Sequence, residues 1–262
     1  MVESLEISKG PVFVINEHLR SIRQFEAMAV APWLPSEGRL LEIGAGAGWQ
    51  AEIFVEKGLR VFAIDVPSSE YLAHSAFPII RYDGIRIPFA DSTFDVVYSS
   101  NVLEHVPHVE LFQQEILRVL KPNGRMIHAL PTSTWRITTS LAHYLWLAKE
   151  IRRRLEGSGP QVGSLGASRQ PTAPKSRLSR LRALLPHRHG EFGNWLTEIY
   201  YFSRPRWVRL FRSAGMIVEA SDPLQLFYTG YSIGDARISL AVRQGLSRWL
   251  GSACRLFVLR RS

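Results

Sequence analysis

The residues with the clearest chemistry lie in segment 42–48, EIGAGAG, where an acid precedes three alternating glycines. Glycines allow the backbone to turn tightly and a ligand to approach it closely, and a helix that starts there offers free N–H groups. Asp65 lies 21 residues beyond Gly44, at the end of the next apolar run. A carboxylate in that place can accept hydrogen bonds from both hydroxyls of a ribose. The pattern therefore predicts a ligand that contains a nucleoside.

The charge beside the glycines indicates which nucleoside. The G-x-G-x-G spacing lacks the third glycine of a dinucleotide fingerprint, and Glu42 stands two residues before Gly44. A carboxylate there would repel a pyrophosphate and attract a cationic amino-acid group. S-adenosylmethionine carries an α-ammonium and a sulfonium and no phosphate. The charges therefore favour S-adenosylmethionine over NAD.

The surrounding pattern predicts the elements that hold this segment. Short apolar runs closed by glycine, proline or acid are typical of strands buried on both faces. Strands that alternate with helices predict βαβ units and a parallel sheet. The predicted strands are 39–44, 60–66, 78–84, 94–100 and 125–131, and the predicted helices are 17–31, 49–58 and 108–124.

The pattern changes after Pro131. We predict an amphipathic helix over 139–155, a loop rich in Gly, Ser and Pro over 156–176, and a short basic helix over 177–189. A helix, a glycine and a strand follow in 205–221, and a last strand in 254–261. The predicted units are an N-terminal helical cap (1–37), a nucleoside-binding α/β core (38–135), a basic helical insertion with a flexible loop (136–203), and the C-terminal part of the core (204–262) with a helical insertion at 222–253.

Charge is spread unevenly along the 262 residues, whose net charge is +9. Residues 1–130 have a net charge of −5 and residues 131–262 a net charge of +14, and 139–188 alone carries +8. Such asymmetry indicates an anionic partner. No apolar run reaches the roughly 20 residues that span a bilayer, the start lacks a signal-peptide layout, and there is one cysteine. A cytoplasmic protein is the expectation.

Successive motifs resemble a known family. LLEIGAGAG, AIDV, YDGIRIPFADSTFDVVYSSNVLEHV and EILRVLKPNGRMI follow one another in the order seen in class I S-adenosylmethionine-dependent methyltransferases of the type-11 group. The resemblance implies a Rossmann-like, doubly wound, seven-stranded sheet whose last strand is antiparallel. It also implies S-adenosylmethionine as cofactor. The implied cofactor-binding residues are Glu42, Gly44, Ala45, Gly46 and Gly48 for the methionine part, Asp65 for the ribose, Asp83 and Gly84 for the adenine edge, and Asn101 near the sulfonium.

His105 is the candidate catalytic residue, because it follows the fourth predicted strand at the end where open α/β sheets bind ligands. A structural or cofactor-side role for it stays open, as does a turn-capping role for Asp83. We interpret His128 as a core or near-site histidine. His187 and His189 flank Arg188, and we expect a solvated, anion-facing cluster there rather than a metal site.

The sequence thus predicts a methyltransferase that acts on an oxygen of a small molecule, sugar or lipid-linked acceptor. Alternatives are an inactive S-adenosylmethionine-binding scaffold, a methyltransferase that acts on nucleic acid, and a nucleotide-linked oxidoreductase. The basic segment 139–188 could contact an anionic membrane, form a lid over the acceptor, or be an ordinary helix with a solvated basic edge. Nucleic acid is not expected, because no nucleic-acid-binding module is present.

Overall fold

A seven-stranded sheet forms the centre of the molecule. The computed structural model describes residues 17–75, 77–156, 184–231 and 237–262. The predicted loop 156–176, apart from its first residue, and the first part of the predicted helix 177–189 lie outside the described residues. The strands are β1 (Arg39–Ile43), β2 (Arg60–Asp65), β3 (Ile79–Arg81), β4 (Phe94–Ser100), β5 (Leu120–Pro131), β6 (Met216–Pro223) and β7 (Cys254–Arg261).

The strand order is β3-β2-β1-β4-β5-β7-β6. Strands β1 to β5 pair in parallel, and β7 is antiparallel to both β5 and β6. This confirms the doubly wound sheet with an antiparallel last strand. In the register, Ile43 of β1 is opposite Ile64 of β2 and Ser99 of β4. The chain segments that follow these three strands therefore meet at one edge of the sheet, where the chain order of the strands reverses.

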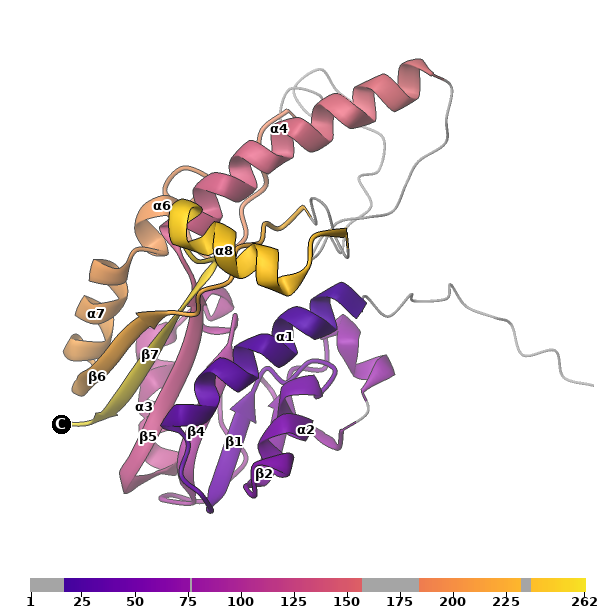
Figure 1. Ribbon diagram of the computed structural model, residues 1–262. Helices are drawn as coiled ribbons and strands as arrows, with labels where there is room; N and C mark the ends of the chain where they lie inside the picture. The colour runs from indigo at the N-terminus through magenta and orange to yellow at the C-terminus, as the bar shows by residue number, and fades with distance from the viewer. Residues whose placement is uncertain (1–16, 76, 157–183, 232–236) are drawn as a thin grey trace, which may run out of the picture.

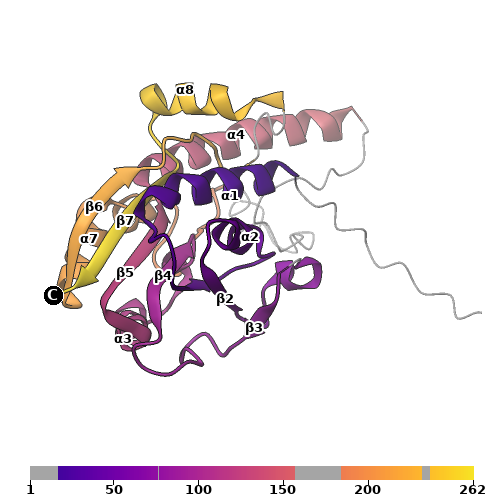
Figure 2. The same ribbon diagram turned by 60° about the horizontal axis from the view of Figure 1, so that its bottom comes forward.

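Helices cover both faces of the sheet (Figures 1 and 2). Helices α1 (Glu17–Val30) and α2 (Trp49–Glu56) bury Ile22, Phe54 and their neighbours on one face. Helices α3 (Val109–Val119) and α7 (Arg204–Ser213) bury Phe112, Phe211 and their neighbours on the other. Two apolar cores therefore hold the sheet rigid, as a parallel sheet requires.

Further elements gather over the carboxyl edge of the parallel strands (Figures 1 and 2). They are the helices α4 (Ser133–Leu155), α6 (Glu198–Tyr201) and α8 (Leu240–Leu250), with the short 3-10 turns η2 (Glu70–His74) and η3 (Leu103–His105). A third 3-10 turn, η1 (Ala31–Trp33), joins α1 to β1. This edge is where the candidate site lies.

The structure corrects three predicted boundaries. Helix α3 ends at Val119 rather than near residue 124, because Lys121 precedes Pro122 and must be extended, and β5 begins at Leu120. Helix α4 begins at Ser133, where the Thr132 hydroxyl accepts a hydrogen bond from the N–H of Trp135 at 3.1 Å. The described part of the predicted helix 177–189 is not helical, because Pro186 forces the residue before it out of the helical region.

Helix α4 turns its predicted apolar stripe outward. Leu141, Leu145 and Leu155 are 62%, 59% and 83% exposed, whereas Trp135 and Ala142 of the same helix are buried. The stripe itself does not pack on the sheet, and the three interpretations of the basic segment stay open. No helix in the described ranges is both long and apolar enough to span a membrane.

Candidate active site

The glycine segment forms a tight turn directly after β1. Gly44, Gly46 and Gly48 have φ angles of 69°, 58° and 79°, in the left-handed region that side chains disfavour. The N–H groups of Gly44 and Ala45 both donate to the carbonyl of Ile64 on β2. A Cβ on Gly44 would lie 2.3 Å from Cγ2 of Val102, whereas at Gly46 the nearest atom would be 3.7 Å away. A Cβ at Gly46 would thus fit without a clash and would make an ordinary contact with Tyr71.

Two acids predicted for the cofactor lie beneath this turn. Asp65 is buried, and its Oδ2 accepts the N–H of Gly46 at 2.8 Å while its Oδ1 accepts that of Val66 at 2.7 Å. Glu42 is also buried, and its Oε2 has no hydrogen-bond partner among the described residues. Burial, and then the nearby charge of Asp65, raises the pKa of Glu42 to about 8. A cation bound beside Glu42 would relieve both effects.

A cleft of about 550 Å³ opens above the turn. We call it the glycine-turn cleft. Its wall includes Asn101, whose φ of 54° is also in the left-handed region. The structure therefore brings the glycine turn and Asn101 together, as predicted. The complete lining is Leu19 and Arg23 of α1, residues 44–47 of the turn, Trp49 and Gln50 of α2, Tyr71 of η2, and Ser100 and Asn101.

A buried polar network behind the cleft holds Asn101 in place, and the sequence did not reveal it. The Glu26 carboxylate accepts hydrogen bonds from Arg23 at 2.6 Å and from the Tyr228 hydroxyl at 2.7 Å. Tyr228 in turn contacts Sγ of Cys254 at 3.0 Å, and that thiol donates to Oδ1 of Asn101 at 3.4 Å. In the sequence, only the i, i+3 spacing of Arg23 and Glu26 in a predicted helix indicates this network. The other partners are distant along the chain.

Asp83 and Gly84 do not line the glycine-turn cleft. The Oδ1 of Asp83 accepts the N–H groups of Ile85 and Arg86, both at 2.8 Å, so this carboxylate caps a turn. These hydrogen bonds lower the pKa of Asp83. The capping role left open above is thus present, and contact with the adenine edge stays a prediction for both residues.

His105 lies beside Glu104 and His189. We call these three residues the Glu104 cluster. The Nε2 atoms of His105 and His189 are each 3.8 Å from Oε1 of Glu104. The rings of the two histidines are 4.8 Å apart, and Trp135 packs at 4.6 Å on His189. Burial lowers the pKa of His105, and it lowers that of His189 to about 4. The expected solvated, anion-facing cluster around His189 is therefore wrong.

A second carboxylate explains why His189 lies here. Oε1 of Glu198 accepts the N–H groups of His189 and Gly190 at 2.6 and 2.7 Å. The other oxygen of Glu198 pairs with the guanidinium of Arg136 at 3.2 Å, and both side chains are buried. This arrangement folds the segment after Pro186 back onto η3. No local sequence pattern predicts it, because α4, α6 and η3 are far apart in the chain.

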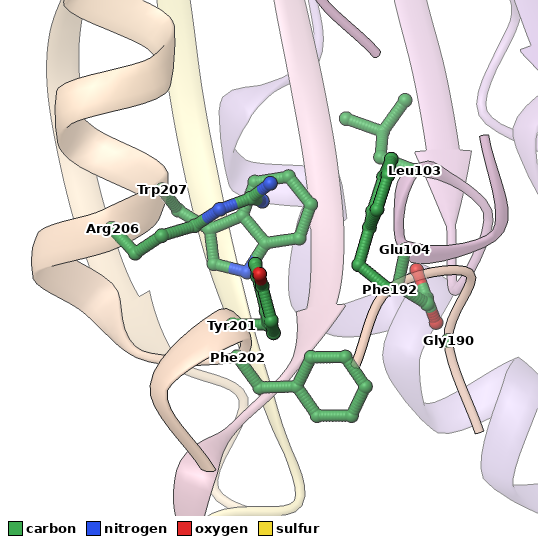
Figure 3. Close-up of a pocket in the computed structure, with 8 residues that line it drawn as sticks. All are labelled: Leu103, Glu104, Gly190, Phe192, Tyr201, Phe202, Arg206 and Trp207. Carbon is green, nitrogen blue, oxygen red and sulfur yellow. The ribbon is translucent and has the colours of Figure 1, made fainter. Parts of the chain in front are cut away.

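A narrow pocket of about 10 Å³, enough for about one water molecule, adjoins Glu104 (Figure 3). Figure 3 shows Arg206 and Trp207 of α7 on one side of it and Leu103, Glu104 and Phe192 on the other. The Arg206 guanidinium lies 4.4 Å from the ring centre of Trp207. Most of the wall is thus aromatic or aliphatic, with one cationic and one acidic side chain.

The two other histidines considered in the sequence, His128 and His187, lie outside the Glu104 cluster. His128 is fully buried in β5 and bonds to the Ser99 hydroxyl through Nδ1 at 2.8 Å, and burial lowers its pKa to about 3. This confirms the interpretation of His128 as a core residue. His187 is exposed and lies outside the Glu104 cluster.

Comparisons with known proteins agree with this geometry. A family model described as a methyltransferase domain matches residues 41–128. An uncharacterized methyltransferase of Mycobacterium leprae is 30% identical over 199 residues, which span 66% of this chain and 72% of the relative. Relatives of the same description in Mycobacterium tuberculosis are 30% identical over 184 residues, or 63% of this chain and 72% of their own length.

Solved structures share the fold. A S-adenosylmethionine-dependent methyltransferase from Mesorhizobium loti has a TM-score of 0.53 at 17% identity, covering 90% of this chain and 98% of its own. A Burkholderia thailandensis N-methyltransferase, solved with S-adenosylhomocysteine, has a TM-score of 0.50 at 15% identity and covers 92% and 78%.

The glycine-turn cleft and the acid next to it fit S-adenosylmethionine. Glu42 does not line the cleft but lies in β1, two residues before Gly44, and its buried, unpaired oxygen suits a cationic amino-acid group. The cofactor of this protein is S-adenosylmethionine. Together, the sheet, the motif order and the relatives establish that the chain belongs to the class I S-adenosylmethionine-dependent methyltransferases, in the type-11-like group.

Proposed function

We propose that the protein transfers the methyl group of S-adenosylmethionine to an oxygen of a small molecule, sugar or lipid-linked acceptor. One observation carries this proposal. The chain that leaves β4 lines the glycine-turn cleft with Asn101 and then, within four residues, presents Glu104 and His105. Two side chains that can accept or donate a proton therefore lie close, along the chain, to the residue that lines the cofactor cleft. An acceptor hydroxyl, which must lose a proton, is the kind of group that uses them.

The chemistry needs alignment more than a powerful catalyst. Bound S-adenosylmethionine supplies a methyl group activated on a sulfonium, so its bond to sulfur breaks, leaving a neutral thioether, as the bond to the acceptor oxygen forms. The chain must hold the acceptor in line and exclude water. We propose that the Nε2 of His105 takes the hydroxyl proton and passes it to solvent, since this side chain is 45% exposed.

The narrow pocket in Figure 3 lies beside Glu104, on the side proposed for the acceptor. If its side chains move apart to admit an acceptor, its aromatic wall would contact an apolar or planar part, and Arg206 would contact an anionic substituent. Replacing Arg206 with Gln should then raise KM for the acceptor and leave cofactor affinity unchanged.

The decisive experiment has two stages. Calorimetry with S-adenosylmethionine and with NAD should show binding of the first alone. Incubation of a cell extract with cofactor labelled in the methyl group, followed by mass spectrometry, should show metabolites that gain one methylene. Binding without transfer to any metabolite or nucleic acid would favour the inactive scaffold. Label recovered in nucleic acid would favour the second alternative, and binding of NAD the oxidoreductase.

The outward stripe of α4 supports a peripheral contact with an anionic membrane as a second part of the proposal. Exposed Leu141 and Leu145 lie on the helix that ends in Arg152, Arg153 and Arg154. A basic helix with an apolar face is suited to the surface of a membrane, and the acceptor would then be lipid-linked. Such a protein would be cytoplasmic and lie at the inner face of the membrane.

Two variants separate the apolar from the charged contribution to this contact. Replacing Leu141 and Leu145 with Ser removes apolar area, and replacing Arg152, Arg153 and Arg154 with Gln removes charge while keeping helix propensity. Both should weaken binding to anionic vesicles, and only the arginine variant should lose the dependence on salt. Wild type that ignores such vesicles would exclude the membrane contact. A raised KM for the acceptor in the arginine variant would then favour a lid.

A further inference from the structure

The Glu104 cluster has the composition and spacing of a metal-binding site. It offers one carboxylate and two imidazoles, and their ligand atoms all lie within 4.8 Å of one another. Glu104 and His105 belong to the same turn, η3, whereas His189 comes from a segment more than eighty residues further along the chain. The three side chains converge only in the folded protein.

The carboxylate of Glu104 lacks the partners that a buried charge needs. Its side chain is fully buried, and neither oxygen accepts a hydrogen bond from any described residue. An unpaired buried carboxylate is costly, so its presence calls for a cation or a proton. The cationic side chain of Arg23 is nearby, but it pairs with Glu26 at 2.6 Å. Its charge is therefore already balanced.

The surroundings hold the second histidine in a fixed position. Glu198 binds the backbone N–H groups of His189 and Gly190, and Arg136 fixes Glu198 from its other side. Trp135 packs against the imidazole of His189. Such support is typical of sites whose ligands are positioned before the ion arrives.

We propose that Glu104, His105 and His189 bind a divalent transition-metal ion. Ligand atoms at about 2.1 Å from one ion, at tetrahedral angles, lie about 3.4 Å apart. The observed separations are 3.8 Å from Oε1 to each Nε2 and at most 4.8 Å within the cluster, so the rings must rotate inward when an ion binds. Both imidazoles are partly exposed, so an ion can enter. Mixed imidazole and carboxylate ligands suit Mn²⁺, Fe²⁺, Co²⁺ or Zn²⁺, and three protein ligands leave positions open.

The open positions give this site a role in the reaction, and this part of the inference rests on the proposed function. An oxygen of the acceptor can occupy an open position, where the ion makes its hydroxyl more acidic. His105 is then a ligand, and the ion rather than the free imidazole prepares the acceptor for methylation. The acceptor class narrows to molecules whose methylated oxygen can reach a metal ion.

Binding of the ion can be measured without activity. Untagged wild type, freed of metal by a chelator, is titrated with Co²⁺ and followed by visible absorption, and with Zn²⁺ in a calorimeter. We expect one ion per chain. Substituting His189→Ala or Glu104→Gln should weaken binding at least tenfold, since each removes a ligand. His108→Ala, which removes an exposed histidine outside the cluster, is the matched control and should bind as wild type does.

Two further measurements keep the result interpretable. Circular dichroism and cofactor titration show whether each variant is folded, and His189→Ala should retain the cofactor affinity of wild type. Wild type that takes up no ion, or a folded His189→Ala variant that binds the ion as tightly as wild type, would overturn the metal site. Neither result would affect the proposed methyl transfer, which fails only if cofactor binding or transfer to an acceptor fails.

Discussion

Two buried glutamates mark the two halves of the proposed site. Glu42 lies in β1, beside the proposed cofactor half, and Glu104 lies in η3, which follows β4, beside the proposed acceptor half. Each has a carboxylate oxygen without a hydrogen-bond partner among the described residues. The surroundings of Glu42 come from the glycine turn and Asp65, within one βαβ unit. Those of Glu104 come from residues 105 and 189. The surroundings of Glu42 are therefore formed by one local motif, whereas those of Glu104 form only when distant segments of the chain fold together.

The largest expected effect distinguishes the acceptor half from the cofactor half. His105→Ala should lower turnover by roughly 10²–10⁴, because it removes the imidazole that acts on the acceptor side. Cofactor affinity should stay nearly unchanged, since His105 does not line the glycine-turn cleft. Single-turnover kinetics and calorimetry measure the two quantities. Full activity would exclude a catalytic role for His105, and an equal loss of cofactor affinity would assign it to the cofactor half.

A smaller effect is expected for the predicted ribose ligand. Asp65→Ala should weaken S-adenosylmethionine binding by about 1.5–3 kcal/mol, the range of charge-assisted hydrogen bonds. Asp91→Ala, which removes an acid that is mostly exposed, is the control and should bind normally. An affinity within error of wild type would mean that the ribose lies elsewhere. Melting curves must accompany this test, because Asp65 also holds the N–H of Gly46.

The hydrogen-bond network behind Asn101 can be weakened by removing one atom. Tyr228→Phe removes the hydroxyl that donates to Glu26 at 2.7 Å and leaves that buried oxygen unpaired. The free energy of unfolding should fall by about 1–3 kcal/mol. Denaturant melts of wild type and variant give this difference. Unchanged stability would show that the hydroxyl is dispensable and that the network does not hold Asn101.

The smallest expected effect is the number of protons that Glu42 releases when the cofactor binds. Its pKa of about 8 exceeds the ordinary glutamate value, so the folded protein without cofactor binds more protons than the unfolded chain between pH 4.5 and 8, and its stability falls as the pH rises through that window. A cofactor ammonium beside Glu42 would lower the pKa again. Calorimetry at pH 7 in buffers of different ionisation enthalpy should therefore show release of up to about one proton in wild type.

Glu42→Gln provides the comparison for that measurement. The amide has nearly the same shape and cannot titrate, so the proton released on binding should be lost while the fold is kept. Equal proton release in wild type and variant would mean that another group titrates and that Glu42 does not face the cation.

The sequence predicted the features that depend on short local segments and missed those that depend on contacts between distant segments. The seven strands and the glycine turn were predictable, because their signals are apolar runs and fixed spacings within short segments. The end of α3 at Val119 was missed because an amphipathic pattern continued up to the extended residue before Pro122. The position of His189 could not be predicted from the sequence. It depends on a hydrogen bond from its own N–H to the carboxylate of Glu198, which in turn pairs with Arg136 of α4.

The candidate site divides in the same way. Glu42, Asp65 and Asn101 were identified from motif positions, and the structure brings Asn101 to the cleft and both acids beneath the turn. Tyr71 was missed, because a tyrosine in a short 3-10 turn has no distinguishing pattern. The outward stripe of α4 was also beyond reach, since periodicity shows that a helix has an apolar face and not what that face contacts.

The most direct test of the central claim is a calorimetric titration of S-adenosylmethionine into wild type, Gly46→Val and Gly245→Val. Gly46 has a φ of 58° and lines the glycine-turn cleft, so valine there would strain the turn and project into space that the ligand needs. Gly245 lies in α8 with no atom within 4 Å of an added Cβ. We predict that wild type and Gly245→Val bind the cofactor and that folded Gly46→Val does not. Wild-type affinity in Gly46→Val would contradict the account.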